Sequence, residues 1–211
     1  MEVRKMHIPI GKLRPGIKTT MESITIHNTG NPRSTALNER AWLVNPSNNR
    51  VASWHIAIDE RMAVEAIPLD EVAWHAANRQ GNYSSIGIEV CESGNQAVVR
   101  RNAAQFVAGM LHGYGWDVDR VTTHRRWSGA NCPRLLLPIW EEFINMIREE
   151  LAILRESGKY PRDLSEWARA GWQFVKKYGI SDGERPKDTV SREEMWTMLE
   201  RLHRLGENDG K

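Results

Sequence analysis

The segment from Ser85 to Glu92, with the sequence SIGIEVCE, constrains the fold more than any other part of the chain. Its apolar residues fall on alternate positions, and turn-forming residues stand on either side, which is typical of a short strand inside a sheet. The alternation places three apolar residues on one face of the strand and Glu89 with Cys91 on the other. We therefore predict a central strand with one apolar face and one face that carries a carboxylate.

Further strand and helix patterns are interleaved along the chain. The predicted strands cover residues 23–29, 51–59, 63–67 and 121–123. The predicted helices cover residues 34–43, 102–114 and 138–154. Strands interspersed with helices indicate an α/β or α+β sheet domain with helices on its faces. We predict the α/β class.

The composition changes after residue 156. Gly158 and Pro161 mark a linker, and two short helical patterns follow over residues 164–177 and 191–205. The spacing of Ser191 and Glu194 predicts a capping box at the start of the second pattern. We therefore divide the chain into a domain over residues 1–156 and a small helical module over residues 160–211. A segment of roughly 50 residues is at the margin of independent stability, so the module would pack on the domain or pair in a homodimer.

Composition excludes several classes of protein. The 211 residues carry a formal net charge of +2, whereas proteins that bind nucleic acid through bulk charge show a strong basic excess. The two cysteines, Cys91 and Cys132, are too few for a disulfide framework. No apolar run approaches the roughly 20 residues of a membrane span, and Met1 to Gly11 lacks the apolar stretch of a secretory signal. We expect synthesis in a cytoplasm, with no nucleic-acid partner and no membrane span.

Three residues are candidates for a metal site. His27 ends a predicted strand, a place where ligands tend to bind, and His124 and Cys132 share one loop after another predicted strand. Imidazoles and a thiolate form a zinc-compatible set, and three protein ligands would leave a fourth position for water or substrate. Spacing alone leaves open that these residues are unrelated, because histidine and cysteine are common in ordinary structural positions.

Glu89 has two alternative interpretations. A carboxylate within a β-forming run either lies on a solvated strand face or acts as a general base beside a metal. The histidines with only a structural role are expected to be His7, His112 and His203. Cys91 is expected to pack as a small apolar residue, with an accessory role left open.

Four motifs occur in a fixed order, namely ITIHNTG, SWHIAID, AWHAANRQGNYSSIGIEVCES and HRRWSGANCP. Together they resemble the N-acetylmuramoyl-L-alanine amidases of the phage endolysin type, which are related to peptidoglycan recognition proteins. The resemblance covers about residues 20–150, and its several separate motifs make it specific. It implies a mixed central β-sheet flanked by helices, with a zinc cleft at one side.

The resemblance also implies roles for individual residues. It implies Zn²⁺ ligands at His27, His124 and Cys132, and a catalytic general base at Glu89. The expected substrate contacts are Trp54, Trp74 and His75, with His55 in the same cleft-lining segment as the first of these.

One position departs from the family pattern. Many relatives carry a lysine two positions before the ligand cysteine, where its charge could stabilise the oxyanion, and here that position is Ala130. The donor would then be a cleft histidine, Arg125, Arg126 or zinc alone. The group that stabilises the oxyanion is therefore left open.

The C-terminal segment has a looser resemblance of its own. Residues 165–199 resemble part of an S-layer-homology-like unit of the kind appended to endolysins, which implies that the module binds a cell-wall polymer. A helical hairpin that only extends the fold or mediates dimer contacts is the alternative.

The implied activity is hydrolysis, with zinc-activated water, of the amide bond between the lactyl group of N-acetylmuramic acid and the L-alanine of the stem peptide. The substrate would be bacterial peptidoglycan, reached after holin-type lysis because no secretory signal is seen. A host autolysin is an alternative source. The rival functions are a non-catalytic peptidoglycan recognition module and a zinc hydrolase that cuts within the stem peptide. The presence of Cys132 favours the enzyme over the recognition module.

Overall fold

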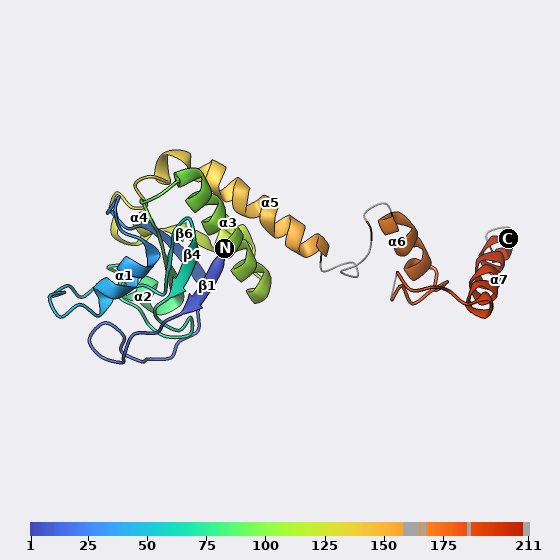
Figure 1. Cartoon of the computed structure of the whole chain (residues 1–211), viewed down its shortest axis with the longest axis horizontal. Coiled ribbons are helices and arrows are strands. Elements are labelled where there is room, and N and C mark those ends of the chain that lie inside the picture. The colour runs from blue at the N-terminus through green and yellow to red at the C-terminus, as the bar shows by residue number, and fades with distance from the viewer. Residues whose placement is uncertain (158–164, 166–167, 185–186, 209–211) are drawn as a thin grey trace. The chain divides into compact units, whose positions relative to one another are not determined.

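The computed structural model describes residues 1–157, 165, 168–184 and 187–208. The chain divides into two compact units, Met1–Ala152 and Ile153–Lys211, coloured blue to yellow and yellow-orange to red in Figure 1. This division falls inside helix α5 (Trp140–Ser157), a few residues before the predicted boundary. The predicted linker at Gly158 and Pro161 lies outside the described residues.

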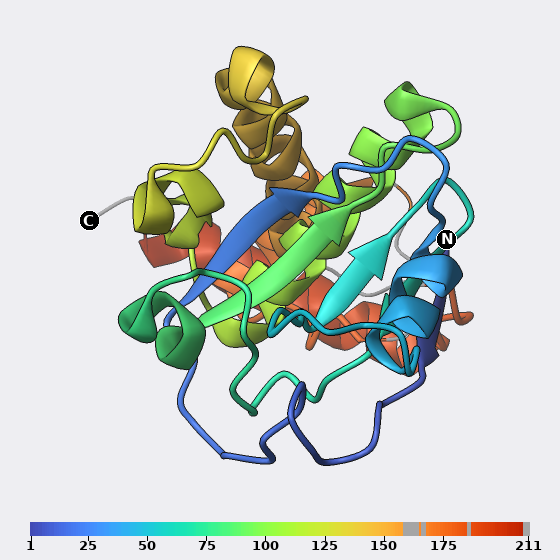
Figure 2. The same ribbon diagram turned by 90° about the vertical axis from the view of Figure 1, so that its left-hand side faces the viewer.

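A six-stranded sheet in the order β1-β4-β3-β5-β2-β6 forms the centre of the first unit. Its strands are β1 (Glu2–Lys5), β2 (Ser23–Asn28), β3 (Ile56–Ile58), β4 (Met62–Glu65), β5 (Ser85–Val90) and β6 (Val121–Thr123). All neighbours are parallel except β3 and β4, which form an antiparallel hairpin. The sheet is therefore mixed, and β5 is a central strand as predicted, between β3 and β2 (Figure 2).

The two faces of the sheet differ in chemistry. The register pairs Ile24 with Ile86, and the isoleucines that follow along both strands share the same fully buried face. Each such side chain stabilises the fold by roughly 1.5–3 kcal/mol through burial. On the opposite face the register pairs His27 with Glu89. The apolar face thus holds the strands together, while the other face presents polar side chains.

Helices cover both faces of this sheet. They are α1 (Ala36–Leu43), α2 (Arg79–Ser84), α3 (Gln96–Tyr114), α4 (His124–Ser128) and α5, with short 3-10 turns over Val118–Arg120 and Leu137–Ile139. Figure 2 shows α1 and α2 in front of the strands and α3 behind them. None of the helices in the described part of the chain is long and apolar enough to cross a membrane.

Local hydrogen bonds explain where the helices begin and end. Thr35 caps α1 by accepting the N–H of Asn38 on its side chain. Helix α3 begins earlier than predicted, because Asn95 accepts the first free N–H groups and starts the helix at Gln96. It ends at Gly115, whose φ of 68° is the left-handed conformation that glycine tolerates best.

Apart from the short 3-10 turns, the sequence analysis does not predict three elements of the first unit, namely β1, α2 and α4, and α4 lies in what was predicted to be a loop. Strand β1 has the sequence EVRK and is exposed along its whole length, so it has no apolar alternation to reveal it. Helix α2 has the sequence RQGNYS, which is short and contains the weak helix formers Gly81 and Asn82. The strand predicted over residues 51–59 is also shorter in the structure, where only Ile56–Ile58 pairs as a regular strand.

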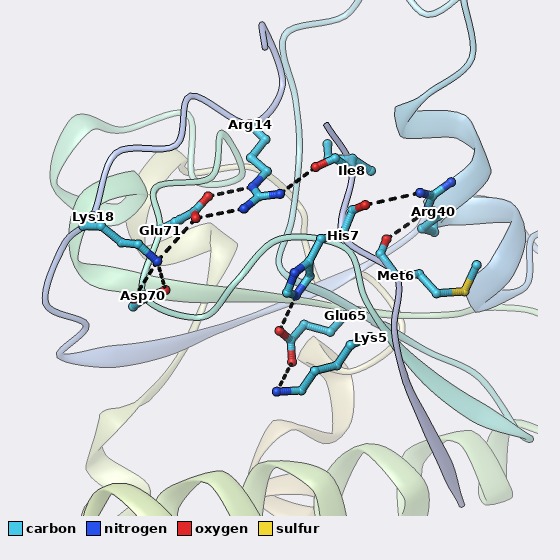
Figure 3. A network of polar contacts seen from close by, with 10 residues as sticks. All are labelled: Lys5, Met6, His7, Ile8, Arg14, Lys18, Arg40, Glu65, Asp70 and Glu71. Atoms are coloured by element: carbon cyan, nitrogen blue, oxygen red, sulfur yellow. Dashed lines mark hydrogen bonds and ion pairs between the residues drawn. The ribbon is translucent and has the colours of Figure 1, made fainter. Parts of the chain in front are cut away.

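Polar contacts hold the N-terminal segment against the first unit (Figure 3). Arg14 donates to both carboxylate oxygens of Glu71, at 2.7 and 3.0 Å, and to the carbonyl oxygen of Ile8, at 2.8 Å. The Arg14 guanidinium also lowers the pKa of the Glu71 carboxyl. Arg40 of α1 donates to the carbonyl oxygen of Met6 at 2.9 Å. These contacts make the segment before β2 an integral part of the unit.

The second unit contains α6 (Arg169–Lys177) and α7 (Arg192–Asn208). The predicted capping box is present: the Ser191 N–H donates to Glu194 at 2.8 Å, and the Glu194 N–H donates to the Ser191 hydroxyl at 3.2 Å. Trp172 of α6 donates its indole N–H to the carbonyl oxygen of Gly183, at 2.7 Å, in the segment that follows this helix. Residues of both helices and of the segment between them line a hollow of about 950 Å³. Most of the predicted start of the first helix, residues 164–168, lies outside the described residues.

Candidate metal centre and active site

A cleft of about 740 Å³ opens on the polar face of the sheet. Its walls come from the end of β2 and the loop after it, from α1, from the segments that precede β3 and α2, and from the segment after β6. All the predicted site residues line this cleft, namely His27, Trp54, Trp74, His75, Glu89, His124 and Cys132. The structure thus brings together side chains that are up to about half the chain apart in sequence.

Two histidines and one cysteine converge at one end of the cleft. One ligand atom from each of His27, His124 and Cys132 lies within 4.8 Å of the other two. The Cys132 Sγ is 3.8 Å from Nδ1 of His27, and the rings of the two histidines are 4.6 Å apart between centroids. Tetrahedral zinc, with bonds of about 2.0–2.3 Å, would hold such atoms roughly 3.3–3.6 Å apart. Small side-chain adjustments would bring the three atoms to that spacing.

His124 begins helix α4, where the Thr123 hydroxyl accepts the N–H of Arg126 and caps the helix. The Trp127 indole N–H donates to Thr25 Oγ1 of β2 at 2.8 Å and so fixes α4 to the sheet. His124 also bonds to the backbone of Ala76, which leaves its Nε2 buried and without a hydrogen-bond partner. A buried imidazole nitrogen with no protein partner is the expected state of a metal-ligating atom.

Hydrogen bonds fix the backbone of the segment around Cys132. Its carbonyl oxygen accepts the N–H of Arg125 at 2.9 Å, and the side chain of Asn28 accepts the N–H of Leu135 at 2.9 Å. Burial raises the pKa of the Cys132 thiol to about 11. A neighbouring dication would reverse this shift, because a coordinating thiol is deprotonated by its metal. The donor set and the partnerless His124 nitrogen therefore fit zinc.

Glu89 lies beside this group on β5. Its Oε1 is 4.0 Å from Nδ1 of His27, and its Oε2 is buried with no hydrogen-bond partner. Burial, with the charges of Glu39 and Glu92, raises the pKa of Glu89 to about 8. The solvated-face interpretation of Glu89 is therefore wrong, because the side chain is in the interior. A buried carboxyl with a perturbed pKa inside a cleft is a candidate acid or base.

Partnerless polar atoms in the interior concentrate at this cleft. Within the described residues, the buried side-chain nitrogen and oxygen atoms without a partner are Trp54 Nε1, Glu89 Oε2 and His124 Nε2. All three residues line the same cleft. Leaving such an atom buried and unpaired costs about 1–3 kcal/mol, so their common location indicates that a ligand completes their bonding.

The two cleft tryptophans differ in how they are held. Trp54 is 8% exposed and packs in a core cluster that includes Ala57 and Cys91, with its indole N–H unpaired. Trp74 is partly exposed, and its indole N–H donates to the carbonyl oxygen of Lys12 at 3.0 Å. Trp54 therefore has a free donor, whereas Trp74 offers mainly the surface of its ring.

His75 and His55 are both deeply buried. His75 is 6% exposed, and its two ring nitrogens lie 3.1 Å from Nε2 of His27 and 3.0 Å from the carbonyl oxygen of Ser85. Both nitrogens therefore already have protein partners, and substrate contact through them stays an untested prediction. His55 is fully buried and is absent from the residues that line the cleft.

Sequence reasoning missed other residues of the cleft. Glu39 of α1 is 7% exposed, and burial raises the pKa of its carboxyl. Arg33 and Arg50 also line the cleft and are exposed. A glutamate in the first turn of a helix is favoured by the helix dipole in any case, so its sequence position gives no signal of a site.

Several other candidates lie outside the site. Arg125 and Arg126, expected as alternative oxyanion donors, are exposed and are not among the cleft-lining residues. His7 pairs with Glu65 at 2.6 Å, and His112 lies exposed near the end of α3. Cys91 is fully buried and packs in the core, as predicted.

The fold and the site together define a mixed α/β protein with two imidazoles and a thiol gathered on one face of its sheet. The family described as N-acetylmuramoyl-L-alanine amidase matches residues 18–135, more than half of the 211 residues. The chain therefore belongs to the N-acetylmuramoyl-L-alanine amidase family, as the resemblance implied.

Particular relatives agree with this assignment. The N-acetylmuramoyl-L-alanine amidase CwlH of Bacillus subtilis is 35% identical over 153 residues, which cover 69% of this chain and 60% of that protein. XlyA of the same organism is 37% identical over 143 residues, which cover 64% of this chain and 48% of that protein. The chain thus spans about half to three-fifths of the length of these curated relatives.

Solved structures show the same fold. The catalytic domain of XlyA matches with a TM-score of 0.66 and 35% identity, and covers 70% of this chain and 99% of that domain. PlyL matches with a TM-score of 0.63 and 32% identity, and covers 70% of this chain and 97% of that structure. The mixed α/β fold expected from the sequence is confirmed by these matches.

Proposed function

We propose that the chain hydrolyses the amide bond between the lactyl group of N-acetylmuramic acid and L-alanine in bacterial peptidoglycan. The observation that carries the proposal is the convergence of two imidazoles, a thiol and a partnerless buried carboxylate in one open cleft. Membership of the amidase family supports the choice of bond.

His27, His124 and Cys132 are the zinc ligands in this proposal. Zinc would supply a Lewis acid for the scissile carbonyl and lower the pKa of a water molecule. The protein's own contribution is to hold the three ligand atoms at one end of the cleft, with room for substrate beside them. The separation of 3.8 Å between Cys132 Sγ and His27 Nδ1 supports this assignment.

Glu89 is the general base. Its free Oε2 accepts the proton of the attacking water and delivers it to the leaving amine. Without a nearby cation the pKa of this carboxyl is about 8, so much of it would be protonated at neutral pH. A dication at the adjacent ligands would lower the pKa and leave the carboxylate ionised.

Trp54 and Trp74 are the substrate contacts that the cleft supports best. The unpaired indole N–H of Trp54 can donate to the carbonyl oxygen as negative charge develops on it. This donor would take the place of the lysine that is absent at Ala130. The partly exposed ring of Trp74 offers a surface on which a sugar or a stem peptide can pack.

The test is digestion of purified peptidoglycan with zinc-loaded and chelator-stripped protein, followed by mass spectrometry of the soluble products. Stem peptides that begin with a free L-alanine, formed only with metal, would establish the bond and the metal dependence. Peptides cut internally would instead establish a different hydrolase. Wall binding without products would favour the recognition module and overturn the proposal.

We further infer that residues 160–211 form a separate module that binds a cell-wall polymer. The division of the chain into two compact units and the hollow between α6 and α7 support it. The test compares how much full-length Glu89→Gln protein pellets with insoluble wall, with and without the added change Val175→Asp. A charge in the hollow should weaken pelleting, and unchanged pelleting would exclude the hollow as the binding site.

The proposed place of action is the host cell wall during phage lysis, after holin-type release. Its support is that a similar solved structure is described as a mutant endolysin from Bacillus subtilis, with 34% identity and a TM-score of 0.66. Lysis of host cells only when the chain is co-expressed with a holin would test it.

A further inference from the structure

We propose that His75 is a positioning residue, which fixes the tautomer and the orientation of the metal ligand His27. The inference rests on the proposed zinc site and deepens it. It differs from the sequence-based expectation, which makes His75 a substrate contact. Two observations support the proposal. One is a chain of two hydrogen bonds, and the other is a glycine that makes room for the His75 ring.

The chain of hydrogen bonds begins at the backbone of Ser85. A carbonyl oxygen can only accept, so the Nε2 of His75, which is 3.0 Å from it, must carry the proton. His75 is 6% exposed, and its ring nitrogens face a second imidazole and a carbonyl oxygen rather than a carboxylate, so burial favours the neutral ring. A neutral imidazole with its proton on Nε2 has an acceptor at Nδ1.

The acceptor at Nδ1 of His75 determines the tautomer of His27. The Nε2 of His27 is 3.1 Å from Nδ1 of His75, so it must donate and must carry the His27 proton. The lone pair of His27 is then on Nδ1. This atom faces the Sγ of Cys132 at 3.8 Å and the Oε1 of Glu89 at 4.0 Å. The backbone thus sets, through one intermediate ring, which nitrogen of His27 is available to a metal.

Gly87 makes the position of the His75 ring possible. A Cβ on Gly87 would lie 2.5 Å from Cγ of His75 and 2.8 Å from its Nδ1, closer than real Cβ atoms approach. Gly87 lies on β5 between Ser85 and Glu89, which share its face of the strand. The ring of His75 therefore occupies the space that any other residue at position 87 would fill.

His55 provides a matched control within the same interior. Its Nδ1 accepts the N–H of Gly87 at 2.9 Å, and its Nε2 donates to the carbonyl oxygen of Glu71 at 2.8 Å. Both ring nitrogens are thus satisfied, as in His75, but neither contacts a candidate ligand. Changes at His55 report the cost of disturbing a buried histidine without disturbing His27.

The experiment measures zinc affinity of the full chain by competition with a chromophoric chelator. His75→Phe should weaken zinc binding about 10- to 100-fold, the usual effect of losing a residue that orients a histidine ligand. His75→Gln, whose amide can still donate to Ser85 and accept from His27, should lose less. Gly87→Ala should weaken zinc binding by displacing the ring, and His55→Asn should leave zinc affinity unchanged.

A second readout needs no metal. Ring nitrogen shifts in NMR of the metal-free protein should show His27 with its proton on Nε2 in the wild type. In the Gln variant this tautomer should persist, and in Gly87→Ala or His75→Phe it should become mixed. The proposal is overturned if zinc affinity and the His27 tautomer are both unchanged in His75→Phe. If that variant does not fold, the same unchanged result in Gly87→Ala overturns it.

The two readouts separate this inference from the function on which it rests. A wild-type chain that binds no zinc would refute the proposed metal site, while the tautomer measurement would still decide whether His75 controls His27. Normal zinc binding together with a mixed His27 tautomer in the wild type would refute only the role of His75.

Discussion

The candidate catalytic groups come from two regions that are built in different ways. His27 and Glu89 are paired in register on the parallel strands β2 and β5 and are buried in the interior. His124 and Cys132 are only partly buried and belong to the segment after β6. The sheet therefore fixes the strand side, whereas a few separate hydrogen bonds fix the loop side. A change at Glu89 on the strand side should affect turnover, and a change at Cys132 on the loop side should affect metal affinity.

Replacing the base is expected to have the largest effect and to separate turnover from metal binding. Glu89→Gln should lower kcat by about 100- to 10,000-fold, the usual contribution of a general acid or base, because the amide cannot accept the proton. Zinc content, measured on the purified protein, should remain that of the wild type. Full turnover in this variant would limit Glu89 to a structural role.

A change of ligand on the loop side should show the reverse pattern. Cys132→Ser should weaken zinc binding by more than the roughly 10- to 100-fold caused by loss of an outer hydrogen-bond partner, because it replaces a ligand atom. Chelator competition would measure this loss. The matched control is Cys91→Ala, which removes a fully buried thiol from the core and should reduce stability while zinc affinity stays unchanged. Equal zinc affinity in Cys132→Ser and wild type would remove Cys132 from the ligand set.

A pH titration tests how the stability of the fold depends on keeping the buried His55 neutral. Burial lowers the pKa of His55 in the folded state to about 4, below its ordinary value of 6.5. The unfolded state therefore takes up the proton first, and stability is lost as the pH falls from about 6.5 towards 4. The loss should be about 3 kcal/mol larger in wild type than in His55→Asn. Urea unfolding across this range measures it, and parallel pH profiles would contradict the assignment.

The smallest expected effect concerns the hydrogen bond from Trp127 to Thr25, which fixes α4 to the sheet. Trp127→Phe removes the hydrogen bond to Thr25, which should cost about 1 kcal/mol of stability and weaken zinc binding less than Cys132→Ser does. Thr25→Val removes the other partner, so a double-mutant cycle isolates the bond. Additive effects would mean that this hydrogen bond does not hold α4 in place.

Much of the fold was predictable because the strands have clear alternation. The positions of β2, β5 and β6 follow from short apolar runs between turn residues. Strand β1 was not predictable, because an exposed edge strand has no buried face to produce a pattern. The start of α3 was missed because the charged pair Arg100 and Arg101 separates its first turn, QAVV, from the apolar pattern that begins at Ala103.

Less of the candidate site than of the fold could be predicted from the sequence. Residues with distinctive chemistry, such as His27 and Cys132, were predictable as candidates from their type and position. The partners of His75 were not, because one of them is the backbone carbonyl of Ser85, and a backbone atom has no identity in the sequence. The role of Gly87 was not predictable either, because Gly87 acts through the space that its missing side chain leaves for His75.

The N-terminal segment matters to anyone who trims this chain to a minimal fragment that keeps the candidate site. The family match begins at residue 18, which suggests that earlier residues are dispensable. A fragment cut there would lose the carbonyl oxygen of Lys12 that holds the Trp74 indole, and the guanidinium of Arg14 that pairs with Glu71. The backbone of Glu71 in turn binds His55. A shortened chain should therefore keep every candidate catalytic group and still have a loosened cleft wall.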